Sequence, residues 1–191
     1  MSGLLRRATK IMVIRHAEKP ASRPPPYGIT LEGARDKECL TARGWQRAGA
    51  LASLFAPANG TFQDPSLARP QFLYASKPVT RKGSRRPFET IMPLAEKLKI
   101  RINSDFLKFE TESMLKDAFL REGVVLICWQ REHILQITDQ ILVNKAVAPP
   151  EWPEDRFDMV WVFDRNPSSA QYSFQQIPQN LPMGDLSTLM K

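Results

Sequence analysis

Short apolar segments alternate with segments of helical periodicity along this chain, and this alternation restricts its fold more than any other sequence feature. The clearest apolar segment, residues 124–128, follows a glycine and has the length and β-branched composition of a buried strand. Residues 159–163 and 172–174 predict two closing strands that pair antiparallel. The remaining strand candidates are residues 10–14, 71–75 and a short edge segment at 100–102.

Amphipathic helices are predicted between these strands. Thr41 is a residue type that caps helix N-termini, and it precedes apolar residues that recur three and four positions apart up to Phe55. A second helix is expected from about Pro87, a residue that the first helical turn tolerates. Shorter helical patterns cover residues 114–119 and 134–142.

Strands that alternate with helices indicate an α/β protein, here a three-layer α/β/α sandwich with a largely parallel central sheet. A length of 191 residues suits one domain with a substantial core, and we find no internal repeat or domain linker. The prolines of residues 20–40 predict a long irregular connection, a type of loop that is often functional. Residues 178–191 show little periodicity and are expected to form a loosely held tail.

The net charge of +7 fits either a nucleic-acid binder or an enzyme that attracts phosphorylated substrates. Basic residues are scattered along the chain, apart from a cluster formed by Arg81, Lys82, Arg85 and Arg86. No zinc-finger, basic-zipper or RNA-binding signature accompanies them. We therefore do not expect nucleic acid as a partner.

Membrane and metal partners are not expected either. No apolar run approaches the roughly 20 residues of a membrane helix, and the basic N-terminus lacks the apolar stretch of a signal peptide. Cys39 and Cys128 lie far apart in the sequence, which is typical of two reduced thiols in a cytoplasmic protein. No histidine and carboxylate cluster has metal-ligand spacing. The sequence does not define the oligomeric state.

Polar residues follow three of the predicted strands: first Arg15 and His16, then Arg86, and then Arg131 and His133. In sheets of this kind, ligands bind beyond the carboxyl ends of the strands. A neutral imidazole is a competent phosphoryl nucleophile, and its ordinary pKa near ~6.5 makes that form available at pH 7. An adjacent guanidinium can hold phosphoryl oxygens in a bidentate fork.

Three sequence blocks resemble the histidine phosphatase superfamily, which also contains the phosphoglycerate mutases. Residues 11–19 (IMVIRHAEK) are similar to its opening strand-Arg-His motif. Residues 40–48 (LTARGWQRA) resemble its L-T-x-x-G-x-x-Q-A helix start. Ser76 followed by residues 86–90 (RPFET) resembles an S…R-x-x-x-T pattern. The blocks occur in the expected order and cover roughly the first half of the chain.

The resemblance implies a phosphoglycerate mutase-like fold and a role for each matching residue. His16 would be the nucleophile that becomes phosphohistidine, while Arg15 and Arg86 would bind the phosphoryl oxygens. Pro87 favours a position for Arg86 at a helix N-terminus, where anions bind well. Arg85 is the alternative, although the spacing to Thr90 favours Arg86. No metal or other cofactor is implied.

The sequence departs from the family at a second pocket histidine, which is expected just beyond a later strand. Residues 129–134 read WQREHI, and related sequences with Trp-x-His put Arg131 at the place of the histidine. An arginine can balance phosphate charge but cannot transfer a proton. His133, two residues later, is the other candidate. We therefore expect Arg131 as a substrate-binding residue and His133 as a catalytic one, with the choice between them open.

In the family, a carboxylate from a variable loop commonly gives the leaving group its proton. We favour Glu112, because related sequences keep a glutamate just ahead of the corresponding helix. Glu110, Glu18 and Asp105 remain as alternatives.

These features predict a hydrolase: a metal-independent phosphatase with a phosphohistidine intermediate on His16. Its substrate would be a phosphorylated small molecule or a phosphoprotein. A mutase would need a larger cap over the site than this chain provides. The departure at Arg131 supports one alternative, a pseudophosphatase that binds a phosphorylated ligand with little or no turnover.

Overall fold

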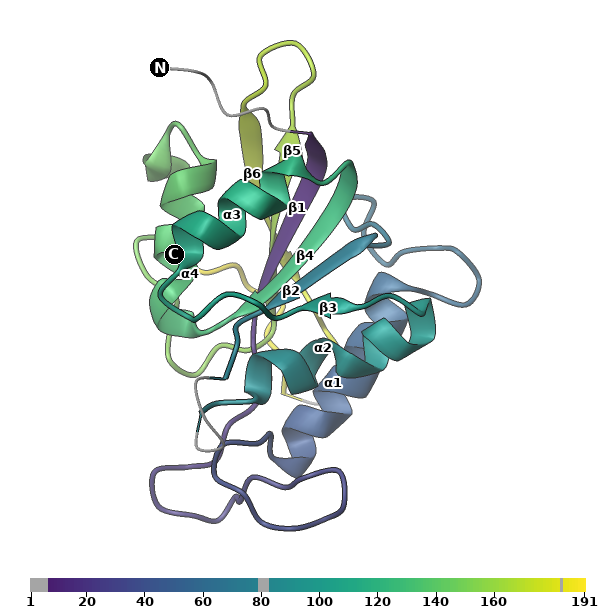
Figure 1. Cartoon of the computed structure of the whole chain (residues 1–191), viewed down its shortest axis with the longest axis vertical. Coiled ribbons are helices and arrows are strands. Elements are labelled where there is room, and N and C mark those ends of the chain that lie inside the picture. The colour runs from purple at the N-terminus through teal and green to yellow at the C-terminus, as the bar shows by residue number, and fades with distance from the viewer. Residues whose placement is uncertain (1–6, 79–82, 183) are drawn as a thin grey trace.

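The computed structural model describes residues 7–78, 83–182 and 184–191. Arg81 and Lys82 of the predicted basic cluster lie outside these residues. Within this part of the chain, six strands form one sheet in the order β3-β2-β4-β1-β5-β6 (Figure 1). Their bounds are β1 (Ala8–Arg15), β2 (Phe72–Ala75), β3 (Ile102–Asn103), β4 (Gly123–Trp129), β5 (Met159–Arg165) and β6 (Tyr172–Pro178).

The sheet is largely parallel, as the sequence predicts. Strands β1 to β4 run parallel to one another, and β1 and β4 pair along their whole length up to Arg15 opposite Trp129. Strand β5 runs antiparallel to β1, and β6 runs antiparallel to β5, which confirms the predicted closing pair. Because β1 and β4 are the two central strands, their carboxyl ends lie in the middle of one edge of the sheet.

Four α-helices connect the strands: α1 (Ala42–Phe55), α2 (Arg86–Leu98), α3 (Thr111–Leu120) and α4 (Arg131–Ile141). A short 3-10 turn, η1 (Lys145–Val147), follows α4. The predicted helix starts are confirmed at α1 and α2. The Thr41 side chain accepts a hydrogen bond from the Gly44 N–H at 3.1 Å, and Pro87 lies in the first turn of α2.

The helices cover both faces of the sheet, which confirms the three-layer sandwich (Figure 1). Because successive strand residues point to opposite faces, Met12 and Ile14 of β1 pack with the apolar residues of α1 and α2. Ile11 and Val13 of the same strand pack with those of α3 and α4. Burial on both faces explains why the central strands read as continuous apolar runs.

Part of the C-terminal segment packs against the rest of the fold. Gln179 and Met190 are buried, and the Gln176 side chain exchanges two hydrogen bonds with the backbone of Met190, at 3.0 and 3.1 Å. Side chains rather than a regular hydrogen-bonding pattern hold this segment, so it shows no periodicity in the sequence. In the part of the chain described above, no helix combines the length and apolar character needed to cross a membrane.

Candidate functional site

A pocket of about 430 Å³ lies beyond the carboxyl ends of β1, β2 and β4. Among the residues that the structure describes, its charged lining contains more cations than carboxylates. The cations are Arg15, Lys19, Lys77, Arg86, Lys108 and Arg131, and the carboxylates are Glu38 and Glu132. His16 lies in the same lining. The excess of positive charge suits an anionic ligand.

His16 follows β1 directly and is buried, with 4% of its surface exposed. Its backbone N–H donates to the Trp129 carbonyl at 3.0 Å, which continues the pairing of β1 with β4 beyond the strand end. Its Nδ1 lies 2.7 Å from the carbonyl oxygen of Ala17. Since a carbonyl only accepts, Nδ1 is the protonated nitrogen, and in the neutral ring Nε2 carries the lone pair.

The surroundings keep this imidazole neutral. Burial, reinforced by the positive charges of Arg15, Arg86 and Lys19, lowers the pKa of His16 to about 3. The ring is therefore neutral throughout the physiological pH range, with its one proton on Nδ1 and with Nε2 as an available nucleophile.

Thr90 explains the spacing of the R-x-x-x-T block. Arg86 and Thr90 are one helical turn apart, and the Thr90 hydroxyl donates to the Arg86 carbonyl at 2.7 Å. The same oxygen accepts the Ala17 N–H at 2.8 Å. One buried side chain of α2 thus fixes the backbone immediately after His16.

The L-T-x-x-G block holds the next residue of the same loop. The Thr41 N–H donates to the Glu18 carbonyl at 3.0 Å, where α1 begins. A Cβ at position 44 would lie 2.6 Å from that carbonyl oxygen, so only glycine allows this close approach. The two blocks after the Arg-His motif therefore position the loop that carries His16.

Arg15 is buried beneath the pocket and held by backbone carbonyls. Its Nη1 donates to the carbonyl oxygens of Pro153, Glu154 and Arg156 at 3.3, 2.6 and 2.9 Å. The guanidinium carbon lies 3.8 Å from the centre of the Phe157 ring. Burial, followed by repulsion from Arg131, lowers the pKa of Arg15 to about 10, so the side chain remains charged at pH 7.

Arg86 occupies the first position of α2 and lines the pocket. It donates to Ser84 Oγ at 3.2 Å and to the Lys37 carbonyl at 2.9 Å, and its Nη2 lies 3.5 Å from Glu38 Oε2. The Nε atoms of Arg15 and Arg86 are both buried without a hydrogen-bond partner among the described residues. Both guanidinium groups line the pocket and carry more N–H donors than these protein contacts use.

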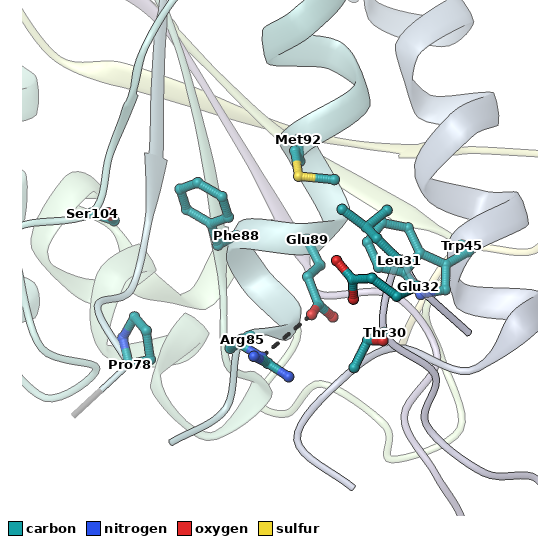
Figure 2. Close-up of a pocket in the computed structure, with 10 residues that line it drawn as sticks. All are labelled: Thr30, Leu31, Glu32, Trp45, Pro78, Arg85, Phe88, Glu89, Met92 and Ser104. Carbon is teal, nitrogen blue, oxygen red and sulfur yellow. Dashed lines mark ion pairs between the residues drawn. The ribbon is translucent and has the colours of Figure 1, made fainter. Parts of the chain in front are cut away.

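Arg85, the alternative to Arg86, turns away from this pocket. It donates to Asp36 Oδ2 at 2.6 Å and pairs with Glu89 at 3.6 Å. Arg85 and Glu89 line a second pocket, which has a volume of about 360 Å³. Figure 2 shows these two side chains together with the apolar side chains of Phe88 and Met92, which line the same pocket. The Arg85–Glu89 pair belongs to that second pocket.

The structure also separates Arg131 from His133. Arg131 lines the first pocket, and its Nη1 lies 3.4 Å from the Trp152 carbonyl. His133 is not among the lining residues. Helix α4 begins at Arg131, and two helical steps of about 100° turn His133 away from the side of Arg131. Of these two candidates, Arg131 therefore faces the pocket and His133 does not.

Glu112 differs from its predicted position. Its carboxylate is 71% exposed on α3 and pairs with Lys116 at 2.6 Å, one turn further along the same helix. This i,i+4 pair keeps Glu112 on the solvent face and away from the pocket. The other three candidates are also engaged elsewhere: Glu110 with the Leu107 N–H, Asp105 with Arg101, and Glu18 with Arg43 and Arg47.

Two carboxylates that sequence reasoning missed lie in the pocket instead. Glu38 belongs to the irregular loop of residues 20–40, and its backbone carbonyl accepts a hydrogen bond from the Arg85 N–H at 3.1 Å. Glu132 follows Arg131 and lies 3.6 Å from Lys108. The position of Glu132 next to the predicted site residue Arg131 could have indicated that Glu132 lies in the pocket. No local sequence pattern indicates the same for Glu38. In the described part of the chain, no group of three or more potential ligand side chains is arranged to hold a metal ion.

Solved structures of other proteins share this fold. A protein from Escherichia coli assigned as an alpha-ribazole-5'-P phosphatase superimposes with a TM-score of 0.57 at 12% identity, over 92% of this chain and 99% of the other. A protein from Agrobacterium tumefaciens assigned as the phosphohistidine phosphatase SixA gives 0.53 at 17% identity, over 88% and 95%. A mycobacterial glucosyl-3-phosphoglycerate phosphatase, determined with VO3, gives 0.51 at 11% identity, over 88% and 97%.

These similarities establish the class of fold. The chain has a phosphoglycerate mutase-like fold, which confirms the fold that the three sequence blocks imply. No family model and no curated protein sequence matches the chain.

Proposed function

We propose that this protein is a metal-independent phosphatase that acts through a phosphohistidine intermediate on His16. The observation that carries the proposal is the hydrogen bond of 2.7 Å from His16 Nδ1 to the Ala17 carbonyl, in a pocket lined mainly by cations. This bond leaves Nε2 with its lone pair, which is the form of imidazole that attacks phosphorus. Phosphatase assignments among proteins of the same fold support the reading.

Three arginines are proposed to bind the phosphoryl group. Arg15, Arg86 and Arg131 all line the pocket, and each guanidinium carries five N–H donors. Guanidinium groups bind phosphoryl oxygens in a bidentate manner and stabilise the charge that the equatorial oxygens share during transfer.

The proposed reaction has two in-line steps. His16 Nε2 first attacks phosphorus, the bond to the leaving oxygen breaks, and that oxygen takes a proton from a pocket carboxyl group. Water then attacks the phosphohistidine and gives its proton to the same carboxylate, and inorganic phosphate leaves as Nε2 recovers its lone pair. Glu38 is the proposed carboxyl group, because it is the lining carboxylate that pairs with the phosphate-binding Arg86.

The proposed substrate is a phosphorylated small molecule or a phosphoprotein. The similar structures include proteins assigned to a ribazole phosphate, to phosphohistidine and to glucosyl-3-phosphoglycerate, which supports a phosphorylated substrate. The buried free thiols of Cys39 and Cys128 support a reducing compartment, which we propose is the cytoplasm.

One observation favours a second function, that of a pseudophosphatase which binds a phosphorylated ligand. Arg131, which the sequence resemblance puts at the place of the second histidine, lines the pocket, and His133 does not. A guanidinium stabilises phosphate charge but does not transfer a proton, so ligand binding would persist while turnover is slow.

Hydrolysis of p-nitrophenyl phosphate in the presence of EDTA separates the two functions. The wild-type protein should release nitrophenol and His16→Ala should not, while Arg131→His should increase the rate if position 131 replaces the second histidine. Calorimetry with inorganic phosphate provides the second measurement. Equal rates for wild type and His16→Ala would rule out the phosphatase, and retained phosphate binding in that case would identify a pseudophosphatase.

A further inference from the structure

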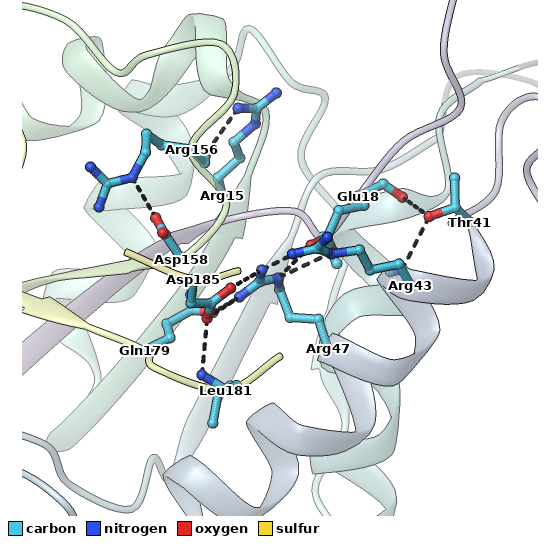
Figure 3. A network of polar contacts seen from close by, with 12 residues as sticks. Arg15, Glu18, Thr41, Arg43, Arg47, Arg156, Asp158, Gln179, Leu181 and Asp185 are labelled. Atoms are coloured by element: carbon cyan, nitrogen blue, oxygen red, sulfur yellow. Dashed lines mark hydrogen bonds and ion pairs between the residues drawn. The ribbon is translucent and has the colours of Figure 1, made fainter. Parts of the chain in front are cut away.

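Arg47 of α1 is a buried cation that the proposed reaction does not use. Its side chain is only 2% exposed, and all five of its N–H donors find acceptors (Figure 3). Nε and Nη2 donate to the Glu18 carboxylate at 2.8–3.1 Å. Nη1 and Nη2 donate to the Asp185 carboxylate at 3.0 and 2.7 Å, and Nη1 also donates to Gln179 Oε1 at 2.8 Å.

This arrangement connects the C-terminal segment to the loop that follows His16. Asp185 belongs to that segment, and its side chain is 3% exposed. Glu18 stands two positions after His16. A buried guanidinium needs both carboxylates, because removal of one partner leaves the cation without full compensation in a medium that solvates it poorly. Glu18 and Asp185 are therefore coupled through Arg47, while Arg43 contacts Glu18 from the exposed side at 3.2 Å.

Glu18 in turn fixes the acceptor of the His16 ring. The amide nitrogen of Glu18 is bonded to the carbonyl carbon of Ala17, and the peptide unit that joins them is planar. The oxygen of that unit accepts the hydrogen bond from His16 Nδ1. Its direction is set on one side by the Ala17 N–H bond to Thr90, and on the other by the contacts of Glu18 with Thr41 and Arg47.

The same C-terminal segment also contacts Arg156, one of the residues that hold the Arg15 side chain. The Arg156 carbonyl accepts from Arg15 Nη1 at 2.9 Å (Figure 3). The Arg156 side chain in turn donates through Nη2 to the Thr188 carbonyl at 2.8 Å. Asp158, which pairs with Arg156, accepts the Leu186 N–H at 2.8 Å. Both residues of the Arg-His motif thus have a connection of two or three contacts to residues 185–188.

We propose that Asp185 is a positioning residue for His16. By completing the coordination of Arg47, it holds Glu18 so that the Ala17 carbonyl keeps His16 in the tautomer with its proton on Nδ1 and its lone pair on Nε2. The effect of Asp185 on catalysis rests on the proposed function. Its effect on the His16 tautomer can be measured without turnover. Loss of Asp185 then releases the ring to exchange its proton between both nitrogens.

The imidazole ¹⁵N spectrum gives the direct test. The chain has only two histidines, so His133→Gln leaves His16 as the single imidazole. In that background we expect one protonated and one unprotonated nitrogen with widely separated shifts. Asp185→Asn should move the two shifts toward each other, because the two tautomers then exchange. Asp185→Glu, which keeps the charge, should restore most of the separation.

Asp117→Asn is the matched control. Asp117 of α3 pairs with Arg121, the residue after that helix, through two contacts of 2.9 and 2.8 Å. Neither residue lines the first pocket, so this variant loses a carboxylate–guanidinium pair, here a more exposed one, at a distance from His16. The turnover of p-nitrophenyl phosphate supplies the second measurement. We expect kcat to fall about tenfold in Asp185→Asn with KM within about twofold, as for an interaction that acts in the transition state, and no such fall in the control.

The outcomes are distinct. Unchanged ¹⁵N shifts in a folded Asp185→Asn protein would overturn the inference, whatever the activity. If that variant does not fold, Glu18→Gln tests the same connection, because this more exposed side chain keeps its acceptor oxygen and loses only the charge. If the wild type has no turnover at all, the proposed function fails, while the tautomer shift still decides the positioning role.

Discussion

The neutral His16 ring makes the stability of this protein depend on pH in a calculable way. In the folded chain, burial lowers the pKa of His16 to about 3, whereas in the unfolded chain the ordinary value of 6.5 applies. The unfolded state therefore binds a proton below pH 6.5 that the folded state does not bind until near pH 3. The contribution of His16 to stability is complete above pH 6.5 and is lost as the pH falls toward 3.

The size of the effect follows from the two pKa values. At pH 4.5 the unfolded histidine lies two pH units below its pKa, and each unit is worth about 1.4 kcal/mol, so the loss relative to pH 7 is about 2.5 kcal/mol. For a domain of this size, such a change lowers Tm by roughly 5–10 °C.

Urea unfolding of the wild type and of His16→Asn at pH 7 and 4.5 measures this contribution. Asparagine keeps an N–H that can donate to the Ala17 carbonyl but has no titration in this range. All other groups titrate in both proteins, so the difference between the two pH-dependent losses isolates His16. The wild type should lose about 2.5 kcal/mol more than the variant. Equal losses would show that His16 titrates normally in the folded protein and would refute the argument for a desolvated nucleophile.

Two further substitutions test the surroundings of His16. Thr90→Val keeps the side-chain volume but removes the acceptor of the buried Ala17 N–H, so we expect a stability loss of about 1–3 kcal/mol and faster hydrogen exchange at that amide than in Thr90→Ser. Persistent protection of the Ala17 amide would contradict the role of Thr90. Glu38→Gln should slow the hydrolysis of an alkyl phosphate by about 10²–10⁴ but that of p-nitrophenyl phosphate much less, because nitrophenolate leaves without a proton. Equal slowing of both substrates would exclude Glu38 as the proton donor.

The fold was predictable because its determinants are local or repeat along the sequence. The apolar run of residues 124–128, the cap at Thr41 and the proline at position 87 each specify an element without knowledge of the rest of the chain. The order of strands and helices then limits the topology. The three sequence blocks added His16, Arg15 and Arg86, all of which line the pocket.

The rest of the site depends on contacts between distant segments. Glu38 reaches the pocket because an irregular loop packs against the start of α2, and no periodic pattern encodes that packing. Glu112 satisfied a sequence pattern, but a lysine one turn away holds it at the surface. Arg47 and Asp185 are 138 positions apart, so their pairing has no local signature. To choose between Arg131 and His133, one must know at which residue the helix begins. The two side chains differ by about 200° around the helix axis, so only one of them faces the pocket.

The position of the pocket between the helical layers has a consequence for ligand discovery. Arg86 begins a helix on one face of the sheet, and Arg131 begins a helix on the other, so an anion held by both joins the two outer layers of the sandwich. Such a ligand stabilises the folded state as a whole, by about 2.7 kcal/mol when its concentration is a hundred times Kd. A rise in melting temperature therefore reports the natural ligand of this pocket whether or not the protein hydrolyses it.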